Sequence, residues 1–265
     1  MVRNASRGRI CPKVYLGVRT DAEMTGGGAM KFHVFYTAEL SSRIVEDHRR
    51  VTSHVGLEVE YHRFGHHPDY NRRYTLHGRF LTEVLRDDPD DVSCFLDADC
   101  LPHDAALLSA VYEWVLANRS FAGNAQNISH AVTRNRIYAA ASMLMIHKDA
   151  WRALGSPSLA WTTRPHSLRE PRVQLDTSEL LTVRANRAGF PYRLLLPLGF
   201  DEEPSWTLGP YGSYGHGTLY PGTWHHFQAN QLAEGPTRLW TERVDDILAG
   251  RELTPRHRSL HFGRV

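Results

Sequence analysis

The stretch Val92-Ser93-Cys94-Phe95-Leu96-Asp97-Ala98-Asp99 decides the fold of this chain of 265 residues. Its first five residues form a short, mostly apolar run, which is typical of a strand buried in a parallel sheet. Two carboxylates follow the run directly. Because α/β sheets bind ligands beyond the carboxyl ends of their strands, we expect Asp97 and Asp99 to face such a crevice.

The sequence before this stretch alternates between strand and helix patterns. We expect strands at residues 32–36 and 57–61, a helix opened by Ser41 or Ser42 between them, a polar loop at 63–73, and a helix that ends before Pro89. Spacing of apolar residues separates the two kinds of element, since strands repeat every second residue and helices every three to four.

The sequence after it continues the alternation. We expect a helix with Pro102 and Asp104 in its first turn, strands at 138–146 and 192–196, a helix at 176–188, a structured loop after Pro197 and a last helix near 239–248. Together these elements predict an α/β fold with a single, mainly parallel central sheet flanked by helices.

Glycines 26–28 divide the chain into two unequal parts. Residues 1–20 contain five basic residues and no acidic one, and we expect residues 1–29 to form a flexible basic N-terminal extension. Residues 30–265 then form one domain. The net charge of +2 is too small to indicate nucleic-acid binding by the chain as a whole.

The composition excludes several classes of protein. With 42% hydrophobic and 23% charged residues, the chain is neither disordered nor of low complexity. The longest apolar run, residues 139–146, is far shorter than the ~18–20 residues of a membrane span. The basic first residues lack the apolar core of a secretory signal, and Cys11, Cys94 and Cys100 form no CxxC pair. We therefore expect a cytoplasmic protein with reduced cysteines.

Asp97 and Asp99 have two interpretations. Alternate carboxylates at the end of a buried strand can supply hard oxygen ligands to a divalent cation, which in turn neutralises a diphosphate. The alternative is a turn whose aspartates cap the helix that follows. The apolar strand that leads directly into both acids favours the metal.

The run from Phe95 to Pro102 resembles the metal-binding D-x-D motif of nucleotide-sugar-dependent glycosyltransferases of the GT-A fold. The likeness extends to small glycosyltransferases of bacteriophage and bacterial genomes. It implies a GT-A-like domain in which Asp97, Ala98 and Asp99 contact the nucleotide sugar, and in which Asp97 and Asp99 hold Mn²⁺ or Mg²⁺.

The order of further segments over residues ~30–230 is also similar to that family. The strand that contains Tyr36 and Thr37 resembles its nucleotide-binding strand, and His77-Gly78 resembles the segment that lies along the nucleotide. Asp176 stands where the family places an acid on the acceptor side. Leu175 precedes it where many inverting members have Glu, so the stereochemical course stays open.

The segment Trp224-His225-His226-Phe227 resembles the part of the family that returns a histidine to the metal. If this segment is extended, His225 and His226 point to opposite sides, so at most one of them is a ligand. We favour His226, because Phe227 beside it can anchor the segment in the core.

Three other features have both a functional and a structural interpretation. Asp176 can be a general base, or the first residue of a capping box with Glu179. Asn124 and Gln126, in the amide-rich segment 122–127, can hold sugar hydroxyls or belong to a turn. The late aromatic residues can stack on a sugar or base, or clamp their own loop; they are Trp206, Tyr211, Tyr214, Tyr220 and Trp224.

The sequence thus predicts a metal-dependent glycosyltransferase that moves a sugar from a nucleoside-diphosphate donor to an acceptor hydroxyl, with Asp176 as the base. A nucleotidyltransferase is the nearest alternative, but residues 37–41 lack the glycine-rich basic loop that it needs. A non-catalytic nucleic-acid-binding module is another, because Arg63, Arg72, Arg73 and Arg79 cluster in the sequence. Glycosyl transfer and nucleic-acid binding are both explained if the acceptor is a modified base in DNA.

Overall fold

The computed structural model describes residues 30–65, 70–127, 136–164, 173–227 and 232–259. The expected N-terminal extension and residues 66–69 of the expected polar loop lie outside these ranges. Among the described residues, no helix has both the length and the apolar character needed to cross a membrane.

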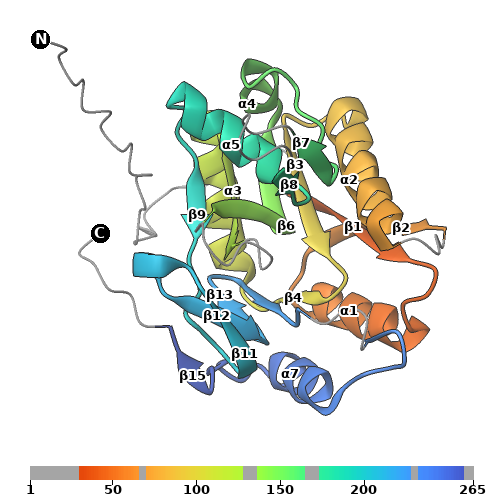
Figure 1. Ribbon diagram of the computed structural model, residues 1–265. Helices are drawn as coiled ribbons and strands as arrows, with labels where there is room; N and C mark the ends of the chain where they lie inside the picture. Colours follow the sequence, from red (N-terminus) through yellow and green to blue (C-terminus); the bar gives the residue numbers. More distant parts are fainter. Residues whose placement is uncertain (1–29, 66–69, 128–135, 165–172, 228–231, 260–265) are drawn as a thin grey trace, which may run out of the picture.

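A six-stranded sheet forms the centre of the fold, in the order β2-β1-β3-β6-β5-β9 (Figure 1). Its strands are β1 (Lys31–Thr37), β2 (Glu58–Phe64), β3 (Val92–Asp97), β5 (Phe121–Asn127), β6 (Ile137–His147) and β9 (Arg193–Leu195). Only β6 runs against the others, pairing antiparallel with β3 and β5. The expectation of a mixed α/β fold with a mainly parallel central sheet is confirmed.

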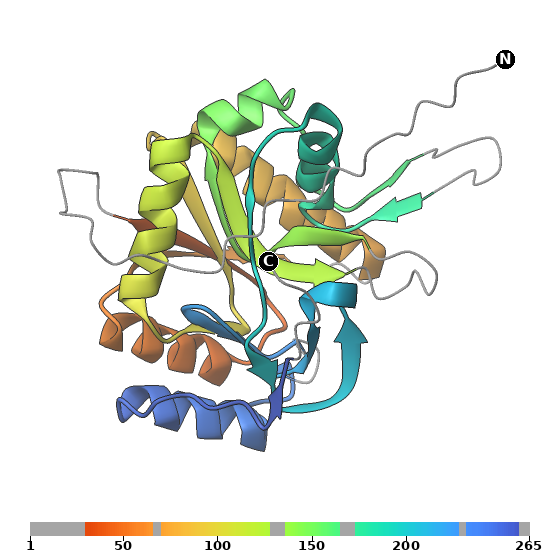
Figure 2. The same cartoon turned by 90° about the vertical axis from the view of Figure 1, so that its left-hand side faces the viewer.

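Helices cover both faces of this sheet (Figure 2). Helix α3 (Ala105–Asn118) packs Leu108, Val111 and Val115 on one face. The opposite face is covered by α2 (Tyr70–Asp87), α4 (Lys148–Ala153) and α5 (Glu179–Ala188). The apolar stripes at helical spacing explain this arrangement, because each helix buries the face on which its aliphatic residues recur.

A second, five-stranded sheet follows the order β15-β10-β13-β14-β4. Its strands are β4 (Cys100–Pro102), β10 (Gly199–Phe200), β13 (Thr218–Tyr220), β14 (Thr223–His225) and β15 (His257–Arg258). The helices α1 (Ser42–His54) and α7 (Arg238–Leu248) lie side by side against it and enclose Trp224 and Trp240 in a separate apolar cluster. The expectation of one sheet is therefore incomplete.

The remaining elements are short. They are the pairs β7 (Thr162–Arg164) with β8 (Val173–Leu175) and β11 (Glu202–Thr207) with β12 (Ser213–His216), and the 3₁₀ turn η1 (Gly209–Tyr211). The region after Pro197, expected as a loop, consists largely of these strands and those of the second sheet.

Several expected boundaries differ from the structure. Residues 122–127 form the strand β5 rather than a turn, and α2 begins at Tyr70, inside the segment expected as a loop. Pro102 belongs to β4, so α3 begins later, where the Asp104 carboxylate accepts a hydrogen bond from the Leu107 N–H. Helix α5 begins at Glu179, three residues after the expected start at Asp176.

Acid is expected to weaken the fold through the buried His48. Its Nε2 donates to the Cys100 carbonyl at 3.0 Å and its Nδ1 accepts from the Tyr61 hydroxyl at 2.8 Å, so the neutral ring is fully satisfied. Burial lowers the pKa of His48 to about 4. Below pH ~6.5 this histidine binds a proton in the unfolded chain but stays unprotonated in the folded one. The free energy of unfolding is therefore highest above that pH and falls as the pH drops toward 4.

This group alone should remove about 3 kcal/mol of unfolding free energy over that range. The measurement is denaturant unfolding of wild type and His48→Gln at several pH values. The variant should be less stable at pH 7.5 but have the flatter pH profile, and two parallel profiles would contradict the role of His48.

Candidate active site

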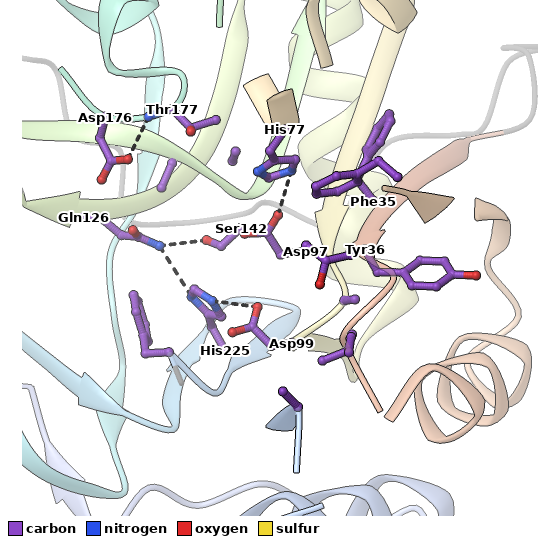
Figure 3. Close-up of a pocket in the computed structure, with 18 of the residues that line it drawn as sticks. Phe35, Tyr36, His77, Asp97, Asp99, Gln126, Ser142, Asp176, Thr177 and His225 are labelled. Carbon is purple, nitrogen blue, oxygen red and sulfur yellow. Dashed lines mark hydrogen bonds and ion pairs between the residues drawn. The ribbon is translucent and has the colours of Figure 1, made fainter. Parts of the chain in front are cut away.

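A cavity of about 610 Å³ opens where the carboxyl ends of β1 and β3 meet the first half of β6 (Figure 3). Its walls come from both sheets and from α2. The lining residues are Phe35, Tyr36, Thr37, Glu39, Leu40, Phe64, His77, Asp97, Ala98, Asp99, Gln126, Tyr138, Ala140, Ala141, Ser142, Asp176, Thr177, His225, Phe227 and Ala233. As the sequence predicts, Asp97 and Asp99 face a crevice at the end of a buried strand.

The backbone brings a histidine to these carboxylates through the second sheet. Strand β3 ends at Asp97 and β4 begins at Cys100, which pairs with His225 of β14. The His225 Nε2 consequently lies 3.2 Å from the Asp99 Oδ1. One potential ligand atom from each of Asp97, Asp99 and His225 lies within 4.8 Å of the other two.

The two carboxylates have opposite electrostatic environments. Burial raises the pKa of Asp97, and the nearby charge of Asp99 acts in the same direction. Burial also acts to raise the pKa of Asp99, but attraction to His225 and its hydrogen bond outweigh that effect and lower the pKa. Asp99 is therefore the carboxylate that stays charged most readily, and a cation would be needed to hold both charges side by side.

His226 points away from the cavity. Its Nε2 lies 3.0 Å from the Thr237 Oγ1, and its ring meets Trp224 and Trp240 edge to face. Its backbone N–H donates to the Asp99 carbonyl. The preference for His226 disagrees with this geometry: strand alternation does place the two rings on opposite sides, but it is His225 that turns toward the acids.

Asp176 forms the opposite wall of the cavity. Its Oδ2 accepts a hydrogen bond of 2.8 Å from the Tyr138 hydroxyl, and its Oδ1 accepts one of 2.7 Å from the Thr177 N–H. The Glu179 carboxylate accepts from the Asp176 N–H, which is half of the expected capping box. The Asp176 side chain does not complete the box, because Ser178 takes the N-cap position.

Gln126 lies between the two walls. Its Nε2 donates to the Ser142 Oγ at 2.9 Å and lies 3.4 Å from the His225 Nδ1, while its Oε1 lies 3.5 Å from the Tyr138 hydroxyl. Polar contacts therefore run from Asp99 through His225, Gln126 and Tyr138 to Asp176.

The predicted nucleotide-side residues lie together near the end of β1. Tyr36, Thr37 and Ala98 line the cavity, as does His77 of α2, whose Nε2 lies 3.4 Å from the Asp97 Oδ1. Their arrangement matches the order that the sequence indicates, with β1 and α2 next to the strand that carries the acids.

Besides His226, two predicted site residues do not reach the cavity. Asn124 is fully buried, and its Nδ2 donates to Thr223 and Ser142 between the two sheets. Gly78 packs against the backbone of Leu159 and Ala160. Both have structural positions in place of the expected contacts with a nucleotide sugar.

Gly78→Ala is expected to destabilise the protein although alanine is the better helix former. A Cβ at this position would lie 2.3 Å from the Ala160 Cα and 2.5 Å from the Leu159 carbonyl oxygen, which are backbone atoms that cannot rotate away. We expect a loss of ~2–3 kcal/mol, measured by denaturant unfolding. Gly65→Ala is the matched control, since a Cβ there would have no neighbour within 4 Å; equal stability of the two variants would refute the argument.

The late aromatic residues clamp their own region. Tyr220 and Trp224 are buried in the core, and Trp206 and Tyr214 pack on each other and on Phe227. The Tyr214 hydroxyl donates to the Asn127 carbonyl. Within the described residues, this favours the structural interpretation of these rings over stacking on a ligand.

Tyr138 and Ser142 are functional candidates that the sequence did not single out. With Ala140 between them, they occupy alternate positions of β6 and face the cavity. The sequence does contain a pattern that could have identified them. Inside an apolar strand, every second residue from 138 to 142 is polar, small and polar in turn, which indicates a face that core side chains do not fill.

The donor set of Asp97, Asp99 and His225 fits a divalent cation. Two carboxylate oxygens and one neutral imidazole nitrogen suit Mn²⁺, and carboxylate oxygens suit Mg²⁺. The Gln126 Nε2 lies 3.4 Å from the His225 Nδ1, and ligation through the His225 Nε2 requires that amide to turn its oxygen toward the Nδ1–H, because a ligating histidine donates from its second nitrogen.

Comparison with known proteins gives only weak likenesses. No family model matches the chain, and no curated protein matches its sequence. Among solved structures, A197 from STIV has a TM-score of 0.31 at 13% identity, covering 46% of this chain and 68% of that one. A glycosyltransferase involved in the glycosylation of the major capsid of PBCV-1 has 0.31 at 11%, covering 48% and 63%. The glycosyltransferase GlyE of Streptococcus pneumoniae TIGR4 has 0.38 at 12%, covering 63% and 45%. Scores this low carry no functional argument, so function has to be inferred from the site itself.

Proposed function

We propose that this chain is a metal-dependent glycosyltransferase, which moves a sugar from a nucleoside diphosphate to an acceptor hydroxyl. The observation that carries the proposal is the convergence of Asp97, Asp99 and His225 on one side of the cavity, with Asp176 on the other. The space between them accommodates a ligand of small-molecule size.

Asp97, Asp99 and His225 would hold Mn²⁺ or Mg²⁺ next to the donor. When bound, such a cation neutralises the diphosphate and stabilises the charge that develops on it as the leaving group. Tyr36, Thr37 and the ring of Phe35 offer a polar and aromatic wall for the nucleotide at the end of β1. His77 contacts Asp97 and orients that carboxylate.

Asp176 would remove the proton of the acceptor hydroxyl. A general base must stand at a fixed place within hydrogen-bond reach of the hydroxyl that it deprotonates. The Tyr138 hydroxyl and the Thr177 N–H each bind one oxygen of Asp176, and each oxygen keeps a lone pair for the acceptor. This role belongs to an inverting reaction, in which the acceptor attacks from the side opposite the leaving diphosphate.

A donor-hydrolysis screen tests the proposal. UDP-, GDP- and TDP-sugars are incubated with the protein and Mn²⁺, and release of the nucleoside diphosphate is measured, with EDTA as the control. We expect release from one donor class only and its loss in EDTA. Transfer of the nucleotide with release of sugar 1-phosphate would instead indicate a nucleotidyltransferase.

Nucleic acid is a further candidate acceptor because two exposed arginines belong to elements that also supply lining residues. Arg63 is exposed and adjoins the lining residue Phe64, and Arg79 is exposed on α2, two residues from His77. Arginine pairs with phosphates and stacks on bases.

The test of a nucleic-acid acceptor is transfer of labelled sugar to DNA with hydroxymethylated pyrimidines, compared with transfer to unmodified DNA. Absence of DNA binding at low salt would exclude this acceptor and leave the sugar donor unaffected.

A further inference from the structure

A second cluster of metal-ligating side chains lies on the edge of the central sheet, away from the cavity. His33 of β1 and Glu60 and His62 of β2 place potential ligand atoms within 4.8 Å of one another. Parallel pairing sets His33 opposite Glu60 and Phe35 opposite His62, so the three side chains share one face. None of the three lines the cavity.

The distances in this cluster match those of a metal site. The His33 Nδ1 lies 3.0 Å from the His62 Nε2. The Glu60 Oε2 lies 3.8 Å from the His33 Nδ1, and the other oxygen, Oε1, lies 3.8 Å from the His62 Nε2. A tetrahedral cation bound at ~2.0–2.2 Å holds its ligand atoms ~3.4 Å apart. The observed separations lie on both sides of that value, and rotation of the Glu60 carboxylate has to bring one oxygen toward both nitrogens.

The far side of His33 is also arranged as in metal centres. Its Nε2 lies 3.5 Å from the Asp88 Oδ2, and that oxygen accepts a hydrogen bond from the Ser93 hydroxyl. With the ring proton on Nε2, on the side of Asp88, the Nδ1 keeps a lone pair directed at His62. Ligating histidines commonly donate their second nitrogen to a carboxylate in this manner.

Burial of both imidazoles acts in favour of a metal. It lowers the pKa of His33 and that of His62, which favours the neutral rings that a cation binds. Two neutral rings 3.0 Å apart share one N–H···N hydrogen bond. A bound cation takes the place of that hydrogen once the His62 proton moves to Nδ1.

We propose that His33, Glu60 and His62 form a second divalent-metal site, suited to Zn²⁺ or a cation with the same preference for imidazole nitrogen. A cation bound there would cross-link the edge strand β2 to β1. Two histidines, one carboxylate and a fourth position open to water are an established zinc donor set. The His62 ring also stacks on Phe35 at 4.6 Å between centroids, so the cross-link would support one wall of the cavity. The proposal is independent of the proposed glycosyltransferase activity.

Lys31 competes with the cation. Its Nζ lies 2.5 Å from the Glu60 Oε2, and this ion pair leaves Oε1 on the side of His62. The ammonium reduces the negative charge available to a metal. Its removal should therefore tighten binding, whereas removal of a histidine should abolish it.

The experiment uses the Asp97→Asn/Asp99→Asn protein, so that the candidate active site does not contribute. Zn²⁺ is titrated into it by calorimetry, and Tm is measured with and without Zn²⁺. We expect one equivalent to bind, and Tm to rise by about 5 °C at a hundredfold excess over Kd. His62→Gln in this background should weaken binding by ~10²-fold or more and remove the Tm shift.

Two further variants control the result. His54→Gln changes an exposed histidine of α1 and should leave Zn²⁺ affinity unchanged. Lys31→Gln should raise the Zn²⁺ affinity. This variant keeps the test valid if His62→Gln fails to fold. The proposal is overturned if the Asp97→Asn/Asp99→Asn protein binds no Zn²⁺, if His62→Gln binds as tightly as its parent, or if Lys31→Gln fails to tighten binding.

Discussion

Asp99→Asn is expected to reduce sugar transfer by ~10³-fold and to abolish Mn²⁺ binding in the cavity, with the fold retained. Asp99 is buried, faces His225 at 3.2 Å and is the carboxylate whose pKa is lowered. Asparagine preserves its size but removes the charge that a cation requires. Transfer is measured as sugar incorporated into acceptor, and Mn²⁺ binding by calorimetry.

Asp149→Asn is the matched control for this change. Asp149 is a half-exposed carboxylate of α4 that does not line the cavity, and it should be replaceable without loss of activity. Full turnover by the wild type in EDTA would refute the role of the metal, even if Asp99→Asn were inactive.

Asp176→Asn is expected to reduce transfer by ~10²-fold or more while Mn²⁺ affinity stays unchanged. The amide oxygen can still accept a hydrogen bond from the Thr177 N–H, and the N-cap position of α5 is occupied by Ser178 rather than by Asp176. The stability of the fold should consequently change little. What the variant loses is the ability to take a proton from the acceptor.

Tyr138→Phe separates the effect of holding the Asp176 side chain in place from the effect of its basicity. It removes the hydroxyl that binds the Asp176 Oδ2 but leaves the carboxylate itself, so we expect a smaller loss of transfer, ~10-fold. Unchanged transfer in Asp176→Asn together with a lower Tm would leave only a structural role for Asp176.

Local pattern predicts the parts of this fold that depend on neighbours in sequence. The apolar run 92–96 is buried as β3, and the stripe of Leu108, Val111 and Val115 packs as expected. The position of Asp97 and Asp99 at a strand end follows from the same run, because a buried strand has to end where polar residues begin.

Choosing between His225 and His226 required information that local pattern does not contain. His225 and Asp99 are 126 residues apart, and the pairing of β4 with β14 alone decides which ring meets the acids. Each of these strands has three residues, too few to show a period of two. The start of α5 was misplaced for a related reason: Tyr138, on another strand, takes the Asp176 side chain away from the helix end.

The division of the proposed metal ligands between two sheets has a consequence for biosynthesis. Asp97 and Asp99 leave the ribosome long before His225, and the strand that carries His225 has to pair with β4 before the imidazole reaches them. A nascent chain that has already assembled β1, α2 and β3 therefore holds Asp97 next to His77 but leaves Asp99 without its partner His225. The proposed cation site is complete only near the end of synthesis, so cation binding there would be a late marker of the completed fold.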